Sequence, residues 1–157
     1  MNNISSHISY AEATKSQTAE RAGFSNTPDE ATIIRMKLVA EKCFEPARLH
    51  FGAPLRVSSF YRSPKLNAKV RGSKTSQHIT GEAIDIDCDG LGEDGPTNAE
   101  LFNWLSLNVD FDQLIWEYGD NKNPAWVHVS YSSSGKQRKE RLRYSIDHGN
   151  VIRSIIK

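Results

Sequence analysis

Apolar residues between positions 33 and 51 recur every three or four residues, which is the spacing of one face of an α-helix. These residues are Ile33, Met36, Ala40, Cys43, Phe44, Ala47 and Phe51. The preceding tetrapeptide, TPDE, combines a capping threonine, a proline at the first helical position and a glutamate three residues after the cap. We therefore predict a long core-facing helix that begins at Thr27 and is kinked in its last turns by Pro46.

Capping signals predict three shorter helices. Residues 9–12 and 97–100 both have capping-box form, and residues 63–64 place a serine cap before a proline. The first of these helices is expected to end at Gly23, after about residue 22, and the helix that follows Pro64 is expected to end at Gly72.

Strand-like segments follow, each bounded by turn residues. They cover residues 55–61, 83–87, 111–118 and 125–131, and then residues 142–147 and 151–156, which form a predicted hairpin around residues 148–150. Residues 83–87 alternate apolar and acidic side chains, as a strand with one carboxylate face would. Helices first and mostly adjacent strands afterwards predict an α+β fold, with a central antiparallel β-sheet and helices packed on it.

A chain of 157 residues, 38% of them hydrophobic, fits a single domain. We expect its core over about residues 8–131, followed by a basic turn and the hairpin in residues 132–157. The net charge of +1 provides no global field that would favour nucleic acid or an anionic membrane. Cys43 and Cys88 lack CxxC spacing, which argues against a thiolate zinc site and favours buried thiols, with a single disulfide as the alternative.

The first 17 residues contain neither a basic n-region nor an apolar h-region, and no stretch approaches the roughly 18 apolar residues of a membrane span. We expect synthesis in the cytoplasm without a signal peptide, no membrane insertion, and export only with the help of another protein.

The segment from Ser76 to Gly90, SQHITGEAIDIDCDG, concentrates the residues that suggest chemistry. Asp85-x-Asp87-x-Asp89-Gly90 copies the first half of an EF-hand calcium loop. The twelfth position of that loop, which should be a bidentate glutamate, is occupied by Pro96. A calcium loop is therefore disfavoured.

A zinc site is the second interpretation of this segment. His78 and Asp85 are seven residues apart, and Gly81 between them permits a turn in a loop that enters the strand. His128 is the best third ligand, because strand alternation places it on one face with Trp126. The remaining histidines, His7, His50 and His148, are poorer candidates. From spacing alone, a zinc half-site and an acidic turn with a hydrogen-bonded histidine both stay open.

The decapeptide SQHITGEAID fills the pattern SxHxxGxAxD, and WVHVS at residues 126–130 resembles a second histidine segment. On these motifs the chain resembles the zinc D-alanyl-D-alanine carboxypeptidase family, and above all its phage and prophage branch, which shares a fold with the hedgehog signalling domain. The likeness runs from about residue 8 to residue 131 and includes the segments ATKSQTA, FYRSP, KTSQH and FDQLIWE in that order. It implies that His78, Asp85 and His128 bind one zinc ion.

The catalytic base is not fixed by the same motifs. Several family members carry a carboxylate three residues before the last histidine, where this chain has Ala125. The hedgehog domain is instead similar to this chain in placing a glutamate at the end of the preceding strand, which corresponds to Glu117. Such a glutamate can face a histidine on the partner strand, so Glu117 is the predicted base and Asp120 the reserve. The alternative is that Glu117 only ends a strand in solvent.

Arg62 matches an arginine that the family associates with substrate and transition-state charge, and its planar fork suits a carboxylate or an oxyanion. A surface arginine is the alternative. Phe60 stands where the family typically has glycine, so the nearby pocket is expected to differ in shape. Ser76 and Gln77 are predicted to support the ligands or to orient substrate, and Trp126 to form a wall of the cleft or part of the core.

The resemblance implies a zinc-dependent peptidase that hydrolyses a bond in the stem or cross-link peptide of bacterial peptidoglycan, as a D-Ala-D-Ala carboxypeptidase-like enzyme or an endopeptidase. It implies action at the cell wall in the manner of a phage endolysin, with a holin-type partner for export and no nucleic-acid partner. The alternative is a non-catalytic, metal-stabilised module of the same fold that binds a peptide or the cell wall. For the basic run KQRKERLR, a wall anchor and a solvated charge run both stay open.

Overall fold

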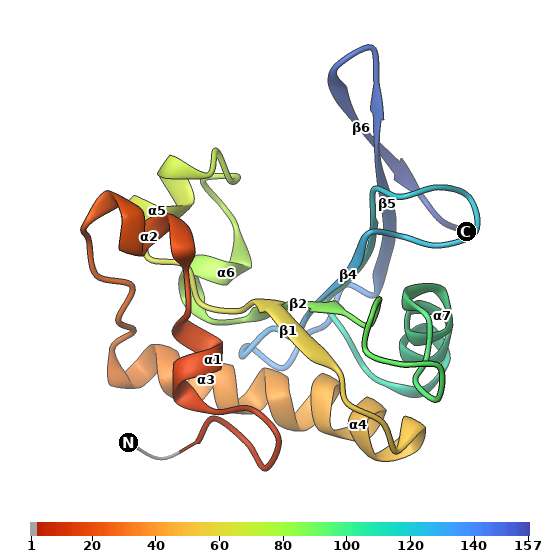
Figure 1. Ribbon diagram of the computed structural model, residues 1–157, viewed down its shortest axis with the longest axis horizontal. Coiled ribbons are helices and arrows are strands. Elements are labelled where there is room, and N and C mark those ends of the chain that lie inside the picture. The colour runs from red at the N-terminus through yellow and green to blue at the C-terminus, as the bar shows by residue number, and fades with distance from the viewer. Residues whose placement is uncertain (1–2) are drawn as a thin grey trace.

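The computed structural model describes residues 3–157, and a six-stranded sheet forms the centre of that part of the chain (Figure 1). In spatial order the strands are β1 (Arg56–Ser59), β2 (Ala83–Asp87), β4 (Trp126–Ser130), β3 (Gln113–Glu117), β5 (Glu140–Asp147) and β6 (Asn150–Ile155). Helices lie on both sides of this sheet, which confirms the predicted α+β class.

One strand pair differs from the predicted antiparallel sheet. Within residues 3–157, neighbouring strands are antiparallel except β3 and β5, which run parallel with Glu117 opposite Tyr144. After β4, residues 131–139 carry the chain across to the free edge of β3. The sheet is therefore mixed, because a crossover connection and not a local turn sets the direction of β5.

The predicted long helix is present as three consecutive segments. They are α3 (Glu30–Val39), a π-helical turn (Ala40–Phe44) and α4 (Glu45–Phe51). The helix begins two residues later than predicted, because Asp29 and not Thr27 is the cap: Asp29 Oδ1 accepts a hydrogen bond from the Thr32 backbone N–H at 2.8 Å. Pro46 lies in the first turn of α4, directly after the π turn. The backbone hydrogen-bond pattern of the helix therefore changes next to the position where proline has no N–H to donate.

The short helices follow the capping signals with two differences. They are α1 (Tyr10–Thr14), α2 (Gln17–Ala22), α5 (Pro64–Lys69), α6 (Gln77–Thr80) and α7 (Asn98–Asn108). The single helix predicted up to Gly23 is two helices, because the Ser16 hydroxyl caps a second one by accepting from the Ala19 backbone N–H. The capping box at Thr97 is present. The sequence did not predict α6, since a helix of four residues is too short to carry an apolar period.

Strand alternation gives the sheet two different faces. One face buries Ile84, Ile86, Leu114, Val127 and Val129 in the main core together with residues of α3, α4 and α7. Figure 1 shows α3 and α4 along this side of the sheet and α5 and α6 on the opposite side. Because alternate residues point to opposite faces, the polar side chains of β2 and β4 are directed toward α6.

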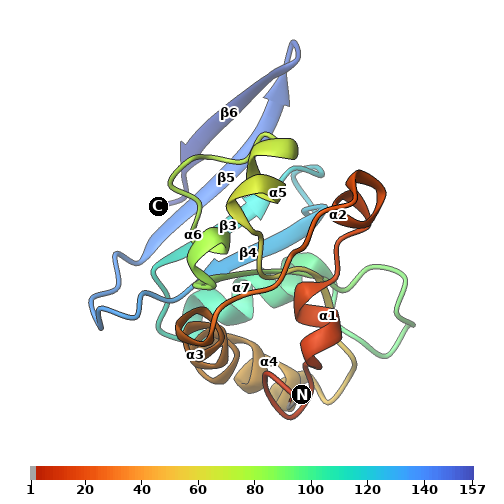
Figure 2. The ribbon, with the colours of Figure 1, turned by 90° about the vertical axis from the view of Figure 1, so that its left-hand side faces the viewer.

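Residues 132–157 belong to the same sheet as the rest of the chain. β5 and β6 form the predicted antiparallel hairpin, and its tip extends beyond the other elements (Figures 1 and 2). At its base, Leu142 is only 1% exposed and lies opposite Ile115 of β3. Among the helices in residues 3–157, none is long and apolar enough to cross a membrane.

Candidate metal centre

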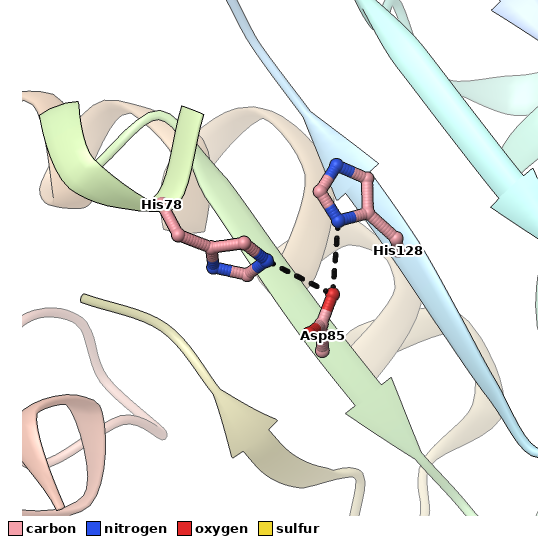
Figure 3. A group of neighbouring side chains, drawn as sticks. All are labelled: His78, Asp85 and His128. Atoms are coloured by element: carbon pink, nitrogen blue, oxygen red, sulfur yellow. Dashed lines mark hydrogen bonds and ion pairs between the residues drawn. The ribbon is translucent and has the colours of Figure 1, made fainter. Parts of the chain in front are cut away.

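Three side chains converge on the face of the sheet opposite the main core (Figure 3). His78 comes from α6, Asp85 from β2 and His128 from β4, and each offers one atom within 4.8 Å of the other two. Asp85 Oδ1 lies 3.2 Å from His78 Nε2 and 2.9 Å from His128 Nδ1. The exposed fractions of the three residues are 1%, 8% and 8%. The structure therefore brings together the two histidines and the aspartate selected from the sequence.

The register of β2 and β4 positions two of these residues. Asp85 and His128 are directly opposite each other in the antiparallel pair, so their side chains leave the same face of the sheet. Ile84 and Ile86, on either side of Asp85, are fully buried in the main core. The alternating sequence AIDID thus fixes the carboxylate through the packing of its apolar neighbours.

The short helix α6 positions the third residue. Ser76 caps it, with Oγ accepting from the His78 backbone N–H at 3.4 Å, and Gly81 ends it with φ of 76°. A Cβ atom at Gly81 would lie 2.8 Å from Met36 Cγ and 2.9 Å from the Thr32 carbonyl oxygen. Only glycine fits both the backbone conformation and the close approach to α3, so Gly81 lets the chain turn from His78 into β2.

The donor atoms of the cluster fit a small divalent cation. His78 Nδ1 lies 2.7 Å from the Phe60 carbonyl oxygen and donates to it, so Nε2 is the ring atom that faces the Asp85 carboxylate and is available to a cation. An imidazole nitrogen and a carboxylate oxygen at this distance share a cation, which is either a proton or a metal ion. Ligands of a tetrahedral zinc ion lie roughly 3.3 Å apart, close to the 2.9 Å and 3.2 Å observed. Two imidazoles and one carboxylate also leave a coordination position open.

The electrostatics of Asp85 agree with this assignment. Burial by itself would raise the pKa of the Asp85 carboxyl, but the charges and hydrogen bonds of His78 and His128 outweigh it and hold the pKa well below its usual range. The side chain is therefore an ionised, acceptor-only group. His128 Nε2, on the far side of its ring, is buried without a hydrogen-bond partner among the described residues.

Glu117 lies at the end of β3 on the same face of the sheet. Ile115 is opposite His128, and Glu117 follows two residues later, so alternation directs it to the side of the cluster. Glu117 is only 9% exposed. Burial raises the pKa of its carboxyl to about 7, an effect to which Asp85 adds and which His128 and Arg62 oppose. Glu117 is thus a buried acid that titrates near neutrality, and not a strand end in solvent.

Arg62 lies next to the same group of charges. Its backbone N–H donates to the His78 carbonyl oxygen at 3.1 Å, which links the FYRSP segment to α6. Burial lowers the pKa of its guanidinium, and the negative charges of Asp85 and Glu117 oppose that effect. Its Nε is buried without a hydrogen-bond partner among residues 3–157. Arg62 therefore carries a partly buried charge with a donor free for a further acceptor.

Trp126 lies beside Glu117. The two are paired across β3 and β4, so the indole is on the face of the cluster, half-buried, with its ring centroid 5.3 Å from that of Tyr118.

Asp120, the reserve base, is exposed in the turn after β3. The backbone N–H groups of Asn123 and Lys122 bond to its carboxylate and lower its pKa. Asp120 is thus engaged in stabilising the turn.

The other acidic and histidine residues have separate partners. The Asp87 carboxylate pairs with Arg56 at 2.7 Å and accepts a hydrogen bond from Asn98 at 3.0 Å. Within the described residues its contacts are therefore those of a structural residue and not of a calcium ligand. The remaining histidines lie elsewhere: His7 pairs with Glu45, His50 stacks on Trp104, and His148 is at the hairpin tip.

Cys43 and Cys88 are buried free thiols, and burial raises the pKa of each to about 12.

The sequence did not identify Asp112, a buried carboxylate just before β3. It is 3% exposed, and its carboxylate accepts from Gln77 Nε2 at 2.9 Å and from Arg138 Nη2 at 2.6 Å. These partners are 35 and 26 residues away along the chain, so no local pattern separates Asp112 from a surface acid.

Comparison with known proteins identifies a peptidase family model that covers the whole site. The family model described as Peptidase M15 matches residues 6–130, a range that contains the three clustered residues as well as Arg62 and Glu117. Among the curated proteins, no sequence matches this chain. The matched range ends at the last residue of β4, before the crossover to β5.

Proposed function

The chain belongs to the peptidase M15 family, and we propose that it is a zinc peptidase that hydrolyses a bond in the stem or cross-link peptide of bacterial peptidoglycan. Family membership indicates a metallopeptidase, and the buried group of His78, Asp85 and His128 offers a site for its metal. One observation carries the proposal: three ligand atoms converge within 4.8 Å on the sheet face that also holds a buried glutamate. Such a site offers two of the groups that a metallopeptidase needs, which are metal ligands and a base.

The three clustered residues are the proposed zinc ligands. His78 would bind through Nε2, because its Nδ1 is committed to the Phe60 carbonyl oxygen, and His128 through Nδ1, the atom nearest Asp85. When bound, zinc supplies a Lewis acid that lowers the pKa of a water molecule toward about 7 and polarises a carbonyl group.

Glu117 is the proposed general base and acid. A carboxyl with a pKa of about 7 is half ionised near neutral pH, so it can accept a proton from the attacking water and return it to the leaving amine. Its burial keeps bulk water away from this proton. The neighbouring indole of Trp126 would wall the cleft on this side.

Arg62 is the proposed stabiliser of the oxyanion that forms as the carbonyl carbon is attacked. Its Nε has no partner among residues 3–157, and its charge is held near Asp85 and Glu117. A preorganised, partly buried guanidinium stabilises a developing negative charge more than a solvated one does. Ser76 and Gln77 are proposed to act indirectly, because their hydrogen bonds hold the helix that carries His78.

The proposed domain spans residues 1–157, with residues 132–157 completing the sheet, and the proposed place of action is the bacterial cell wall. A role like that of a phage endolysin, with release through a holin-type partner, stays a prediction from the sequence. Carboxypeptidase and endopeptidase activity are both compatible with the proposal.

The test is digestion of purified peptidoglycan, with mass analysis of the products and measurement of bound metal. We expect about one zinc per chain and new peptide termini for the wild type. Glu117→Gln should keep the zinc and lose at least about 100-fold in rate, and His128→Ala should lose both. His148→Ala, at the exposed hairpin tip, is the control and should match the wild type.

Two results would contradict the proposal. One is hydrolysis by metal-free protein, and the other is an unchanged rate for Glu117→Gln. A zinc-loaded protein that retains intact peptides and releases no products would support the binding module instead. The mass of the products also identifies the bond that is cut.

A further inference from the structure

Asp112 connects the C-terminal segment to the helix that carries His78. Arg138 binds the Asp112 carboxylate through three donors. Its backbone N–H donates to Oδ1 at 2.9 Å, and its guanidinium donates from Nε to Oδ1 at 3.1 Å and from Nη2 to Oδ2 at 2.6 Å. On the other side, Gln77 Nε2 donates to Oδ2 at 2.9 Å. The result is a chain of direct hydrogen bonds from Arg138 through Asp112 to Gln77, the residue before His78.

The backbone of Asp112 is fixed by two further strands. Its N–H donates to the Ser130 carbonyl oxygen at 2.8 Å, and its own carbonyl oxygen accepts from the Glu140 N–H at 3.0 Å. Ser130 is two residues from His128 on β4, and Glu140 begins β5. Asp112 therefore lies between the segments that carry both histidines of the candidate centre.

The carboxylate depends on Arg138 for its charged form. With 3% of the residue exposed, burial alone would raise the pKa of Asp112, but hydrogen bonds from Arg138, supported by Gln77, hold it below its usual range. Without the Arg138 guanidinium, this buried carboxylate would keep two neutral donors, Gln77 Nε2 and the backbone N–H of residue 138, but no cation, and such a group takes up a proton more readily or rearranges to reach water. Protonation weakens the acceptor of Gln77, and rearrangement moves it, so either change loosens the link to α6.

The C-terminal segment also connects to the C-terminal end of α6, through Ser133. Ser133 donates to Glu82 Oε1 through its backbone N–H at 2.8 Å and through its hydroxyl at 2.6 Å. Thr80, the last residue of α6, donates to Glu82 Oε2 at 2.7 Å. Residues 132–138 thus connect to both ends of α6, through Glu82 to Thr80 and through Asp112 to Gln77. A helix of four residues has too few internal hydrogen bonds to hold its own position.

On this basis, and resting on the proposed function, we infer that Arg138 is a positioning residue for the metal site: through Asp112 and Gln77 it holds α6 so that His78 meets Asp85 and His128. Arg138 lies outside the residues that the family model matches, which end at 130. The segment after the shared peptidase core thereby sets the metal affinity of this chain.

The test uses Arg138→Gln with a matched control in the next residue. Lys139→Gln removes the same charge, but Lys139 is 70% exposed and pairs with Asp110, which is 52% exposed. One readout is hydrogen–deuterium exchange of residues 77–81 in metal-free protein, and the other is zinc affinity by competition with a chelator. We expect Arg138→Gln to speed exchange in α6 and to weaken zinc binding by about 10- to 100-fold. Lys139→Gln should change neither, and Arg138→Lys should restore part of the affinity.

Gln77→Met separates positioning from folding, because it leaves the pair of Arg138 and Asp112 intact and removes only the link to α6. It should reproduce the faster exchange of α6 and the loss of zinc affinity. Wild-type exchange in α6 for both Arg138→Gln and Gln77→Met would overturn the inference. Failure of the proposed function is distinguishable: a wild type that binds no zinc, or that binds zinc without hydrolysing peptide, contradicts the peptidase, while exchange in metal-free protein still decides the role of Arg138.

Discussion

Asp85 and His128 face each other across β2 and β4, with Asp85 Oδ1 2.9 Å from His128 Nδ1. The packing of the main core fixes this relationship, since the residues on either side of Asp85 are fully buried on the opposite face. His78 has no such strand to hold it and reaches the cluster from a helix of four residues. Two of the proposed ligands therefore belong to the rigid sheet, and the third depends on the contacts of α6.

Asp85→Asn should abolish tight zinc binding. The amide has nearly the same shape as the carboxylate but no charge, so it is a weaker ligand between two imidazoles. We expect zinc affinity to fall by at least about 100-fold in a chelator competition, since even the loss of an outer partner costs 10- to 100-fold. Asp87→Asn is the control, because Asp87 lies on the same strand but binds Arg56 and Asn98. Equal affinity of the two variants would remove Asp85 from the ligand set.

Glu117 should make the metal-free protein less stable as the pH rises. Its pKa is about 7 in the folded protein against an ordinary value of 4.5, so the folded state binds the proton more tightly than the unfolded chain does. The free energy of unfolding then falls between pH 4.5 and 7, and the loss is complete above pH 7. Glu117→Gln should be more stable than wild type at pH 8 by up to about 3 kcal/mol, and nearly equal to it at pH 4.

Urea denaturation at the two pH values, with a chelator present, measures this difference. Glu93→Gln provides the control, because Glu93 is an exposed acid in the loop before α7. A stabilisation by Glu117→Gln that is the same at pH 4 and pH 8 would show that the carboxyl does not titrate as the buried geometry implies.

The rate of hydrolysis should fall at acidic pH as Glu117 gains a proton. The base must be ionised to accept a proton, and a nearby dication lowers the pKa of a carboxylate. For the zinc-loaded enzyme we therefore expect the acidic limb of kcat/KM to have its midpoint between 4.5 and about 7. The limb should vanish from the residual activity of Glu117→Gln. A limb that persists unchanged in this variant would assign the titration to another group.

Gly81→Ala should destabilise the fold more than a comparable change elsewhere. Gly81 has φ of +76°, and an added Cβ would lie under 3.0 Å from side-chain and backbone atoms of α3. Gly149, with φ of +80°, has nothing within 4 Å of the same position, so Gly149→Ala measures the backbone cost alone. We expect about 1 kcal/mol for Gly149→Ala and about 2–4 kcal/mol for Gly81→Ala in urea denaturation. Equal costs would mean that α6 shifts freely relative to α3.

Much of the local structure follows from short-range patterns. The Thr97 capping box, the Gly23 helix end and the alternation of residues 83–87 each depend on residues within a few positions of one another. The errors at this level are also local. Asp29 is a better cap than Thr27 at the start of α3, and Ser16 begins a second helix where one was predicted.

From the sequence, spacing alone left a zinc half-site and an acidic turn open, and the family resemblance carried by SxHxxGxAxD and WVHVS then selected the candidate ligands; their role as zinc ligands stays a prediction. The sequence also determined the α+β class and the hairpin around residues 148–150. Only the tertiary structure decided that β5 runs parallel to β3, that Glu117 is buried enough to titrate near neutrality, and that Arg138 reaches α6 through Asp112. These features arise from contacts between residues tens of positions apart, and the free energy of such contacts depends on burial and strand pairing that no short stretch of sequence encodes.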